Sequence, residues 1–360
     1  IALWANLVRE KMNILICGNL GYIGPVVTKH LKVAIPFSEI TGLDTGYFAS
    51  RVTSFGRIGD TYCNYQIYQD IRDVSPEFLG KFDALVILSA ISNDPMGNKF
   101  EEVTNSINYI AVKKIIEPYV ALPNKRLVFA SSCSIYGASE GEAKNEFNTL
   151  NPLTAYAKSK VAVEKALQRC DMGPGTTATS LRFATACGMS DRLRLDLVLN
   201  DFVASALINN RIEILSDGTP WRPLIHVKDM SRAIEWAIHR DENVATPYLA
   251  INTGSNLWNY QVSDLAKAVA DIVPNCELSV NTQALPDKRS YKVNFDLFKA
   301  LAPNYSPIYT LRETISELVD GISEIKHLIS DDFRTSDFIR LHILENHIKN
   351  RRLSPDLRWT

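Results

Sequence analysis

A tyrosine and a lysine stand four residues apart in the segment AYAKSK, residues 155–160. On a helix, Tyr156 and Lys160 would share one face. A free phenol titrates at about pH 10, and a cation beside it lowers that pKa because it favours the tyrosinate. Such a phenol can remove the proton of a hydroxyl group while a hydride leaves the same carbon atom. The alternative is an exposed tyrosine–lysine pair without a chemical role.

A glycine-rich loop, CGNLGYIG at 17–24, directly follows the first predicted strand and opens a helix. Gly18, Gly21 and Gly24 would let the backbone turn tightly and approach a pyrophosphate, and the start of the helix would supply unpaired N–H groups. Glycines also serve ordinary tight turns. Their place between a strand and a helix nevertheless predicts a dinucleotide site.

An acidic residue, Asp44, ends the second predicted strand, twenty residues after Gly24. A carboxylate at this place can accept hydrogen bonds from both ribose hydroxyls of an adenosine, and it would repel a 2′-phosphate. No arginine immediately follows Asp44 to bind such a phosphate. NAD is therefore favoured over NADP as the cofactor, and the alternative for Asp44 is a solvated loop residue.

The elements that would position these residues alternate regularly through the first half of the chain. Short β-rich runs are separated by longer helical patterns, which predicts an α/β fold with a Rossmann-like, doubly wound parallel sheet covered on both faces. Ser132 would end the fifth strand, where it could hydrogen-bond the same oxygen as Tyr156. The predicted strands cover 13–17, 39–44, 64–69, 84–89, 126–132 and 178–183, and a long helix covers roughly 99–119.

The alternation loosens after about residue 183, and we expect a smaller α/β carboxy-terminal lobe that binds the substrate across a shared cleft. Short strands are predicted at 211–215, 223–227 and 289–295, and helices at 262–273, 310–329 and 336–350. The last of these helices has basic residues at its end, as suits a helix C-terminus. We expect it to pack over the carboxy-terminal lobe, the alternative being a dedicated partner site.

Four parts of the chain follow from this pattern. They are an N-terminal extension at 1–11, an NAD-binding domain at 12–183 to which later segments can return, a substrate-binding lobe at 184–330 and a helical tail at 331–360.

The composition argues against several kinds of partner. The chain has 39 basic and 40 acidic residues and no long run of one sign, so electrostatics gives no reason to expect nucleic acid or an anionic membrane. The longest apolar stretch, 84–91, is far too short to span a bilayer. Six cysteines without CxxC or Cys/His clustering indicate reduced thiols in a cytoplasmic protein and no metal site.

Taken together, the motifs resemble those of the extended short-chain dehydrogenase/reductases, in particular the group of nucleotide-sugar epimerases and dehydratases. The resemblance covers about residues 13–325. It implies a homodimer that forms through helices at roughly 99–119 and 156–170. The matching segments, in the order of the family, are GNLGYIG, LD at 43–44, DIRD at 70–73, SSCSIYG at 131–137, YAKSK at 156–160, RPLIHVKD at 222–229 and AINTGS at 250–255.

The resemblance also implies roles for single residues. Ser132, Tyr156 and Lys160 would be the catalytic trio. The expected contacts to NAD are Gly18, Gly21, Tyr22, Ile23, Gly24, Asp44, Asp70, Ile71, Ala90, Asn108, Tyr156 and Lys160. The expected contacts to a nucleoside-diphosphate sugar are Ser132, Ser134, Thr185, Asn200, Arg222 and Arg289.

Arginine suits the phosphates of such a sugar because a guanidinium binds phosphate with two parallel hydrogen bonds. The alternatives are a surface strand residue for Arg222, an ordinary ion-pair partner for Arg289 and a helix-start residue for Asn200. His226 and Asp229 are expected to begin a helix and to bind local backbone rather than to perform chemistry.

Departures from the family pattern narrow the reaction. Its 4,6-dehydratases usually have an acidic pair just after the catalytic serine or threonine, where this chain has Cys133 and Ser134. A thiol and a hydroxyl are poor substitutes for that pair, so dehydration is disfavoured. Thr185 stands where hexose 4-epimerases commonly have an asparagine, which sets the ordinary UDP-galactose specificity in question.

The leading hypothesis is an NAD-dependent epimerase that acts through a transient keto sugar, with Tyr156 as the acid and base. The alternatives are a 4-ketoreductase or dehydrogenase of a nucleotide sugar and, less favoured, a 4,6-dehydratase. A non-catalytic scaffold that senses NAD is least favoured because it has no need for the trio.

Overall fold

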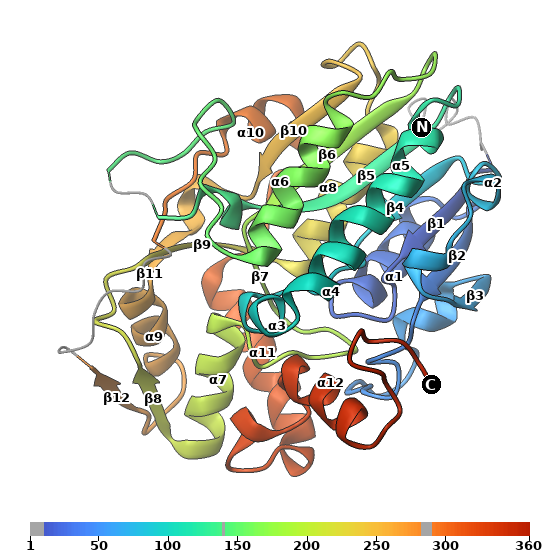
Figure 1. Ribbon diagram of the computed structural model, residues 1–360. Coiled ribbons are helices and arrows are strands. Elements are labelled where there is room, and N and C mark those ends of the chain that lie inside the picture. The colour runs from blue at the N-terminus through green and yellow to red at the C-terminus, as the bar shows by residue number, and fades with distance from the viewer. Residues whose placement is uncertain (1–10, 139–140, 282–289) are drawn as a thin grey trace.

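The computed structural model describes residues 11–138, 141–281 and 290–360. Its main layer is a seven-stranded sheet in the order β10–β6–β5–β4–β1–β2–β3 (Figure 1). Every neighbouring pair is parallel, which confirms the predicted Rossmann-like sheet. The strands are β1 Asn13–Cys17, β2 Glu39–Asp44, β3 Tyr65–Tyr68, β4 Ala84–Ile87, β5 Arg126–Ser132, β6 Thr177–Phe183 and β10 Tyr248–Thr253.

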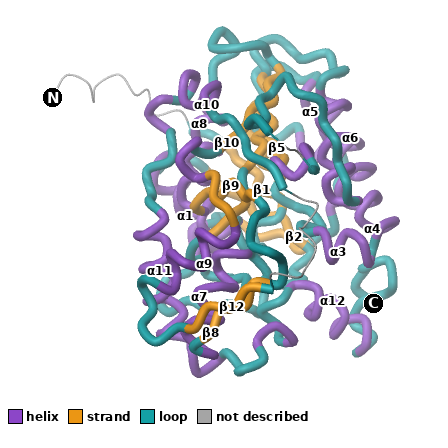
Figure 2. The backbone as a smooth tube through the Cα atoms, turned by 90° about the vertical axis from the view of Figure 1, so that its left-hand side faces the viewer, coloured by secondary structure: helices purple, strands orange, loops and turns teal. Residues whose placement is uncertain are grey.

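Helices cover both faces of this sheet, as Figure 2 shows from the side. Successive residues of β1 point to opposite faces: Ile14 and Ile16 belong to the core beneath α1 and α8, whereas Leu15 and Cys17 belong to the core beneath α5 and α6. Both faces are apolar for this reason, and the strands read as continuous apolar runs. The helices of this layer are α1 Gly24–Ala34, α2 Pro76–Leu79, α3 Asp94–Lys99, α4 Glu101–Asn105, α5 Val112–Val120, α6 Ala155–Leu167 and α8 Val227–His239.

A second lobe has its own apolar core between α7, α9 and α11. Two small sheets, β11–β9–β7 and β12–β8, belong to it. Its strands are β7 Thr185–Cys187, β8 Arg211–Ile214, β9 Trp221–His226, β11 Asn259–Gln261 and β12 Glu277–Val280. Its helices are α7 Val198–Asn209, α9 Val262–Ala270 and α11 Leu311–Ile325. The two remaining α-helices of the described residues are α10 Asp296–Leu301 and α12 Arg340–Lys349.

Two predicted elements differ from the structure. The long helix at 99–119 is interrupted by a π-helical turn, Ser106–Ala111. The strand predicted at 289–295 is wrong over its described part, which makes only an isolated bridge between Val293 and Lys144. Asparagine side chains there replace a strand partner: the N–H of Val293 donates to Asn259 Oδ1 at 2.8 Å, and the N–H of Phe295 donates to Asn256 Oδ1 at 2.8 Å.

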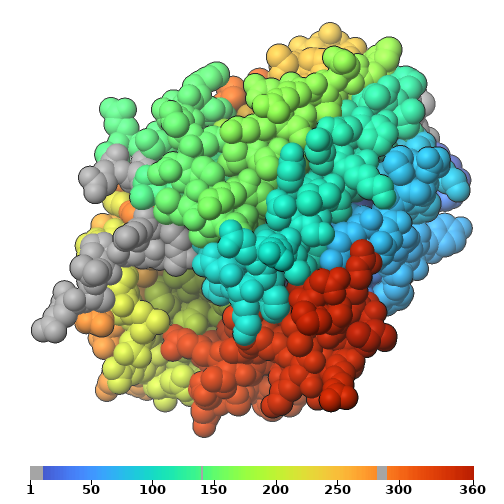
Figure 3. Space-filling view, viewed as in Figure 1, coloured from blue at the N-terminus to red at the C-terminus, as the bar shows by residue number. Residues whose placement is uncertain are grey.

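The predicted packing of the last helix is also wrong. Leu341, Leu344 and Ile348 of α12 pack in the apolar core of the first lobe, whereas Phe338 and Ile339, just before the helix, pack against the core of the carboxy-terminal lobe. In the space-filling view the red tail lies against the blue and teal surfaces of the first lobe (Figure 3). Apolar spacing reveals that a helix has a buried face, but it does not reveal which lobe covers that face. None of the described helices combines the length and apolar character that a membrane span requires.

Candidate active site

A cavity of about 870 Å³ lies between the lobes, at the carboxyl ends of β1, β4 and β5. The strand order reverses beside β1, and ligands of open α/β sheets bind at such a reversal. The structure brings many residues expected from the sequence to this cavity. They are Gly18, Gly21, Tyr22, Ile23, Gly24, Asp44, Asp70, Ile71, Ala90, Ser132, Ser134, Tyr156, Lys160, Thr185 and Arg222.

The glycine loop is folded so closely that side chains have no room at two of its positions. Gly18 has φ +90°, and a Cβ there would lie 2.6 Å from the backbone N of Ser89. A Cβ on Gly24 would lie 2.2 Å from the carbonyl oxygen of Asn19. No side chain caps the start of α1, so its first N–H groups remain available to an anion. The loop therefore fits the diphosphate of a dinucleotide.

Asp44 is held in place at the end of β2. Its two carboxylate oxygens accept hydrogen bonds from the backbone N–H of Leu20 at 3.1 Å and of Gly46 at 2.7 Å. Burial raises the pKa of this carboxyl, and the two backbone hydrogen bonds act in the opposite direction. The carboxylate is thus tied to the glycine loop, at the place where an adenosine ribose is expected.

Tyr156 lies in the first turn of α6, which Thr154 caps. The Thr154 hydroxyl accepts from the N–H of Ala157 at 3.2 Å and donates to Asp94 at 2.7 Å. Lys160 follows one turn later and is only 2% exposed. Its Nζ lies 5.4 Å from the centre of the Tyr156 ring. Ser132, at the end of β5, lies close enough to Tyr156 for its hydroxyl to lower the pKa of the phenol. The trio expected from the sequence is therefore assembled at one wall of the cavity.

The electrostatics of the protein alone do not make the phenol acidic. Burial raises the pKa of Tyr156 to about 12, although the Ser132 hydroxyl acts against this. Burial also lowers the pKa of Lys160 to about 7, despite the opposing charge of Glu164. A positively charged cofactor ring beside the phenol would favour the tyrosinate. The acidity expected from the sequence would therefore have to come from the oxidised cofactor, because burial raises the pKa of Tyr156 in the protein alone.

The two residues after Ser132 face different surroundings. Cys133 is buried outside the cavity, donates to the carbonyl of Arg182 at 3.1 Å, and has a thiol pKa that burial raises. Ser134 lines the cavity, and its buried hydroxyl has no hydrogen-bond partner among the described residues. An unsatisfied hydroxyl at a cavity wall is suited to a ligand.

Two asparagines expected at the site do not line the cavity. Asn108 exchanges two hydrogen bonds with the backbone of Ile91, at 2.8 and 3.0 Å, and so fixes the segment after β4. Asn200 is fully buried; it accepts from the N–H of Gly188 at 3.1 Å and donates to the Tyr22 hydroxyl at 3.2 Å. Both amides therefore hydrogen-bond residues of the cavity wall or next to it without facing the cavity themselves. Arg289 lies outside the described residues.

His226 and Asp229 begin α8, as expected from the sequence, but only His226 binds the local backbone. His226 caps α8, with its ring accepting from the N–H of Lys228 at 3.1 Å. Asp229 lies in the first turn of that helix and accepts from the N–H of Ile308 at 3.1 Å. The other ring nitrogen of His226 lies 2.7 Å from the carboxylate of Glu317, so the polar groups of both residues are satisfied partly by distant segments.

Sequence reasoning missed a buried ion pair in the cavity wall. Arg194 Nε donates to Asp196 at 2.8 Å, and another of its nitrogens donates to Ser92 Oγ at 2.9 Å. Asn93 donates to the same carboxylate at 2.7 Å. The segment DRLRLD at 191–196, in which charges alternate with leucines shortly after β7, carried a signal for these residues.

Comparison with known proteins agrees with this site. Residues 14–254 match the NAD dependent epimerase/dehydratase family, and the chain belongs to that family. This confirms the predicted family and its cofactor, NAD.

Individual relatives are distant in sequence, but this chain aligns with most of the length of each of them. A UDP-glucose 4-epimerase of Lactobacillus helveticus is 24% identical over 280 residues, which span 72% of this chain and 82% of that protein. A solved NDP-hexosamine 5,6-dehydratase, TunA, has a TM-score of 0.72 at 20% identity, covering 87% and 98% of the two chains. The UDP-glucuronic acid 4-epimerase of Bacillus cereus, solved with UDP-glucuronic acid and NAD, has a TM-score of 0.71 at 21% identity, covering 87% and 100%.

Proposed function

We propose that the protein is an NAD-dependent epimerase of a nucleoside-diphosphate sugar. The observation that carries this proposal is the position of Ser132, Tyr156 and Lys160 on one wall of the cavity that also contains the glycine loop. A phenol, a hydroxyl and a lysine beside a dinucleotide loop are suited to moving a proton and a hydride at one carbon atom.

In this proposal the Tyr156 oxygen takes the proton from a ring hydroxyl of the sugar, usually that on C4. Ser132 hydrogen-bonds the same sugar oxygen and fixes its distance from the phenol. When bound, NAD would supply the acceptor for the hydride of that carbon and the donor for its return. The keto sugar turns over between these two transfers, and Tyr156 gives the proton back to the oxygen.

The other walls support the choice of substrate. Arg222 lines the cavity from β9, and a guanidinium there is suited to the diphosphate of the sugar nucleotide. Ser134 and Thr185 line the same space with hydroxyl groups that can bind a sugar in either orientation. Cys133 is buried away from the cavity, so the usual acidic pair of a dehydratase has no counterpart after Ser132.

The proposal is tested by adding single nucleoside-diphosphate sugars to the NAD-loaded protein. The absorbance of reduced nicotinamide and the sugar products are measured together. We expect an epimer with no net reduction of the cofactor. Stoichiometric reduced cofactor would instead identify a dehydrogenase, and a dehydrated keto sugar would identify a dehydratase. No product from any sugar, with NAD still bound to the protein, would leave only the scaffold that senses NAD.

A further inference from the structure

A buried arginine from the C-terminal tail lines the cavity. Arg340 is the first residue of α12 and lies far beyond residue 254, where the family match ends. Only 2% of its surface is exposed, and its guanidinium lies 4.5 Å from the centre of the Phe48 ring. One of its nitrogens donates to the carbonyl of Arg192 at 2.8 Å.

Arg340 has no carboxylate at ion-pair distance within the described chain, although the charges of Asp44 and Asp196 act on it. Two neighbouring buried arginines have carboxylate partners: Arg192 pairs with Asp60 at 2.7 Å, and Arg194 pairs with Asp196 at 2.8 Å. No ion pair in the described part of the chain includes Arg340. Burial and the charge of Arg194 lower the pKa of Arg340 to about 9. A buried cation without an anion is unfavourable, so this position is suited to an anionic ligand.

The place of Arg340 identifies the part of the ligand that it can reach. Its guanidinium lies over the ring of Phe48, four residues after Asp44 at the expected adenosine end, and it donates to the carbonyl of Arg192, four residues before Asp196. Asp196 is paired with Arg194, whose charge in turn acts on Tyr156 at the catalytic end. In a dinucleotide that spans these two ends, the connecting group is the diphosphate.

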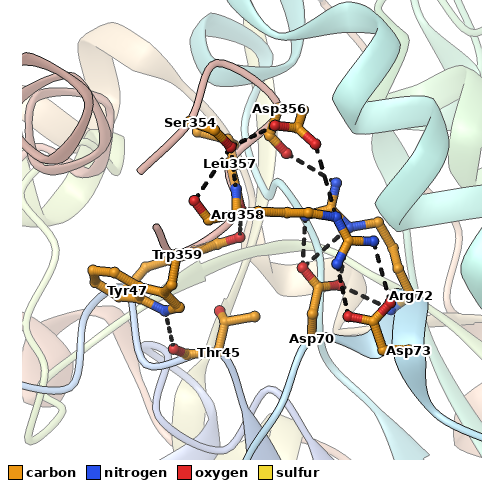
Figure 4. A network of polar contacts seen from close by, with 10 residues as sticks. All are labelled: Thr45, Tyr47, Asp70, Arg72, Asp73, Ser354, Asp356, Leu357, Arg358 and Trp359. Carbon is orange, nitrogen blue, oxygen red and sulfur yellow. Dashed lines mark hydrogen bonds and ion pairs between the residues drawn. The ribbon is translucent and has the colours of Figure 1, made fainter. Parts of the chain in front are cut away.

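The chain that follows α12 is fastened to the wall of the cavity beside Asp70, as Figure 4 shows for residues 354–359. Trp359 Nε1 donates to the carbonyl of Thr45 at 2.6 Å, and the Tyr47 hydroxyl donates to the carbonyl of Leu357. Arg72, which is also paired with Asp70, donates to the carbonyl of Leu357 at 3.2 Å. Thr45, Tyr47 and Asp70 line the cavity. The tail therefore binds directly to residues that form the adenosine end.

We propose that residues 340–360 are part of the dinucleotide site. Arg340 binds the diphosphate of NAD, and residues 353–359 hold the wall that faces the adenosine. This inference rests on the proposed placement of NAD in the cavity. The tail thus completes the cofactor site from a part of the chain that the family match does not include.

The test compares Arg340→Met with Lys349→Met, which removes an exposed positive charge from the same helix. Each full-length protein is freed of nucleotide, and its NAD affinity is measured by calorimetry. We expect the dissociation constant for NAD to rise about 10- to 100-fold in Arg340→Met, because hydrogen bonds to charged groups are lost. Lys349→Met should bind NAD like the unaltered protein.

Thermal unfolding of the same nucleotide-free proteins separates ligand binding from folding. Methionine retains most of the apolar volume and removes an unpaired buried charge, so Arg340→Met should unfold at the same or a higher temperature. Unchanged NAD affinity in Arg340→Met would overturn the inference. So would a lower unfolding temperature that accompanies the loss of affinity, because the residue would then be structural. If the unaltered protein itself failed to bind NAD, the proposed function would fail instead.

Discussion

The two ends of the cavity are built differently. At the catalytic end, Ser132, Tyr156 and Lys160 come from β5 and α6, two elements that follow each other along the chain. At the adenosine end, Asp44 and its neighbours meet Leu357 and Trp359 from the opposite terminus. The difference indicates that the expected catalytic residues are encoded in local motifs, whereas the wall beside Asp44 depends on contacts between distant segments.

The strongest test of the catalytic end is Tyr156→Phe. Removing the hydroxyl removes the proposed proton acceptor, so turnover should fall by about 10²- to 10⁴-fold. NAD binding should persist, because the ring still fills its place in the wall. Turnover is measured by product formation with the NAD-loaded protein, and Tyr65→Phe on the exposed β3 is the matched control. Turnover like that of the control would refute the role of Tyr156.

A side chain added at Gly18 of the glycine loop should destabilise the fold more than one added at Gly56. Gly18→Ala combines an unfavourable φ of +90° with a Cβ only 2.6 Å from the backbone N of Ser89. Gly56→Ala has a similar φ of +86° but meets nothing within 4 Å. The difference between the two variants therefore isolates crowding, which we expect to lower the free energy of unfolding by about 1–3 kcal/mol. Urea denaturation measures it, and equal stabilities would show that the loop has room.

Lys160, at the catalytic end, should make the unfolding free energy of the protein depend on pH. Its pKa is about 7 in the folded protein, compared with about 10.4 for a lysine in an unfolded chain. Between these values the unfolded state binds the proton and the folded state does not, so this group makes stability rise with pH by at most about 1.4 kcal/mol per unit. Below pH 7 both states are protonated, and the contribution of Lys160 is constant.

The measurement is the difference in unfolding free energy between the nucleotide-free protein and Lys160→Met from pH 7 to pH 8.5. Other titrating groups are common to both proteins and cancel. Lys158→Met, an exposed lysine on the same helix, is the control and should show no such slope. A slope for Lys160 equal to that of the control would mean that the lysine is charged in the folded state.

The smallest effect is expected at the adenosine end. Trp359→Phe removes the hydrogen bond from Nε1 to the carbonyl of Thr45 and keeps an aromatic ring near Tyr47. We expect a loss of about 0.5–1.5 kcal/mol in unfolding free energy, together with faster release of NAD in stopped-flow experiments. Unchanged release would indicate that this part of the tail does not hold the cofactor wall.

The sequence predicted what local patterns encode. The strands β1, β2 and β5, the glycine loop and the helix of Tyr156 each depend on residues close in the chain, and all were placed from the sequence. Asn108 was predicted as a pocket residue, but its amide is used by the backbone of Ile91. The spacing of residues in the sequence does not indicate whether a buried asparagine side chain faces a cavity or the protein interior.

The tail could not be predicted for a related reason. The apolar period of the last helix indicated a buried face, and its basic residues suited a helix end, but neither signal identifies the lobe that the helix contacts. Arg340 is indistinguishable in sequence from the exposed arginines at 351 and 352. Its role depends on Phe48, Arg192 and Asp196, which are far from it along the chain.

The most direct measurement follows the hydride itself. The NAD-loaded protein is incubated with a panel of nucleoside-diphosphate sugars that carry deuterium on C4, and the products are analysed by NMR and mass spectrometry. The proposed mechanism predicts an epimer that retains its deuterium, because the same hydride leaves and returns on a cofactor that stays bound. Deuterium that accumulates in released reduced cofactor, or an epimer that has exchanged it for hydrogen from water, would contradict the mechanism.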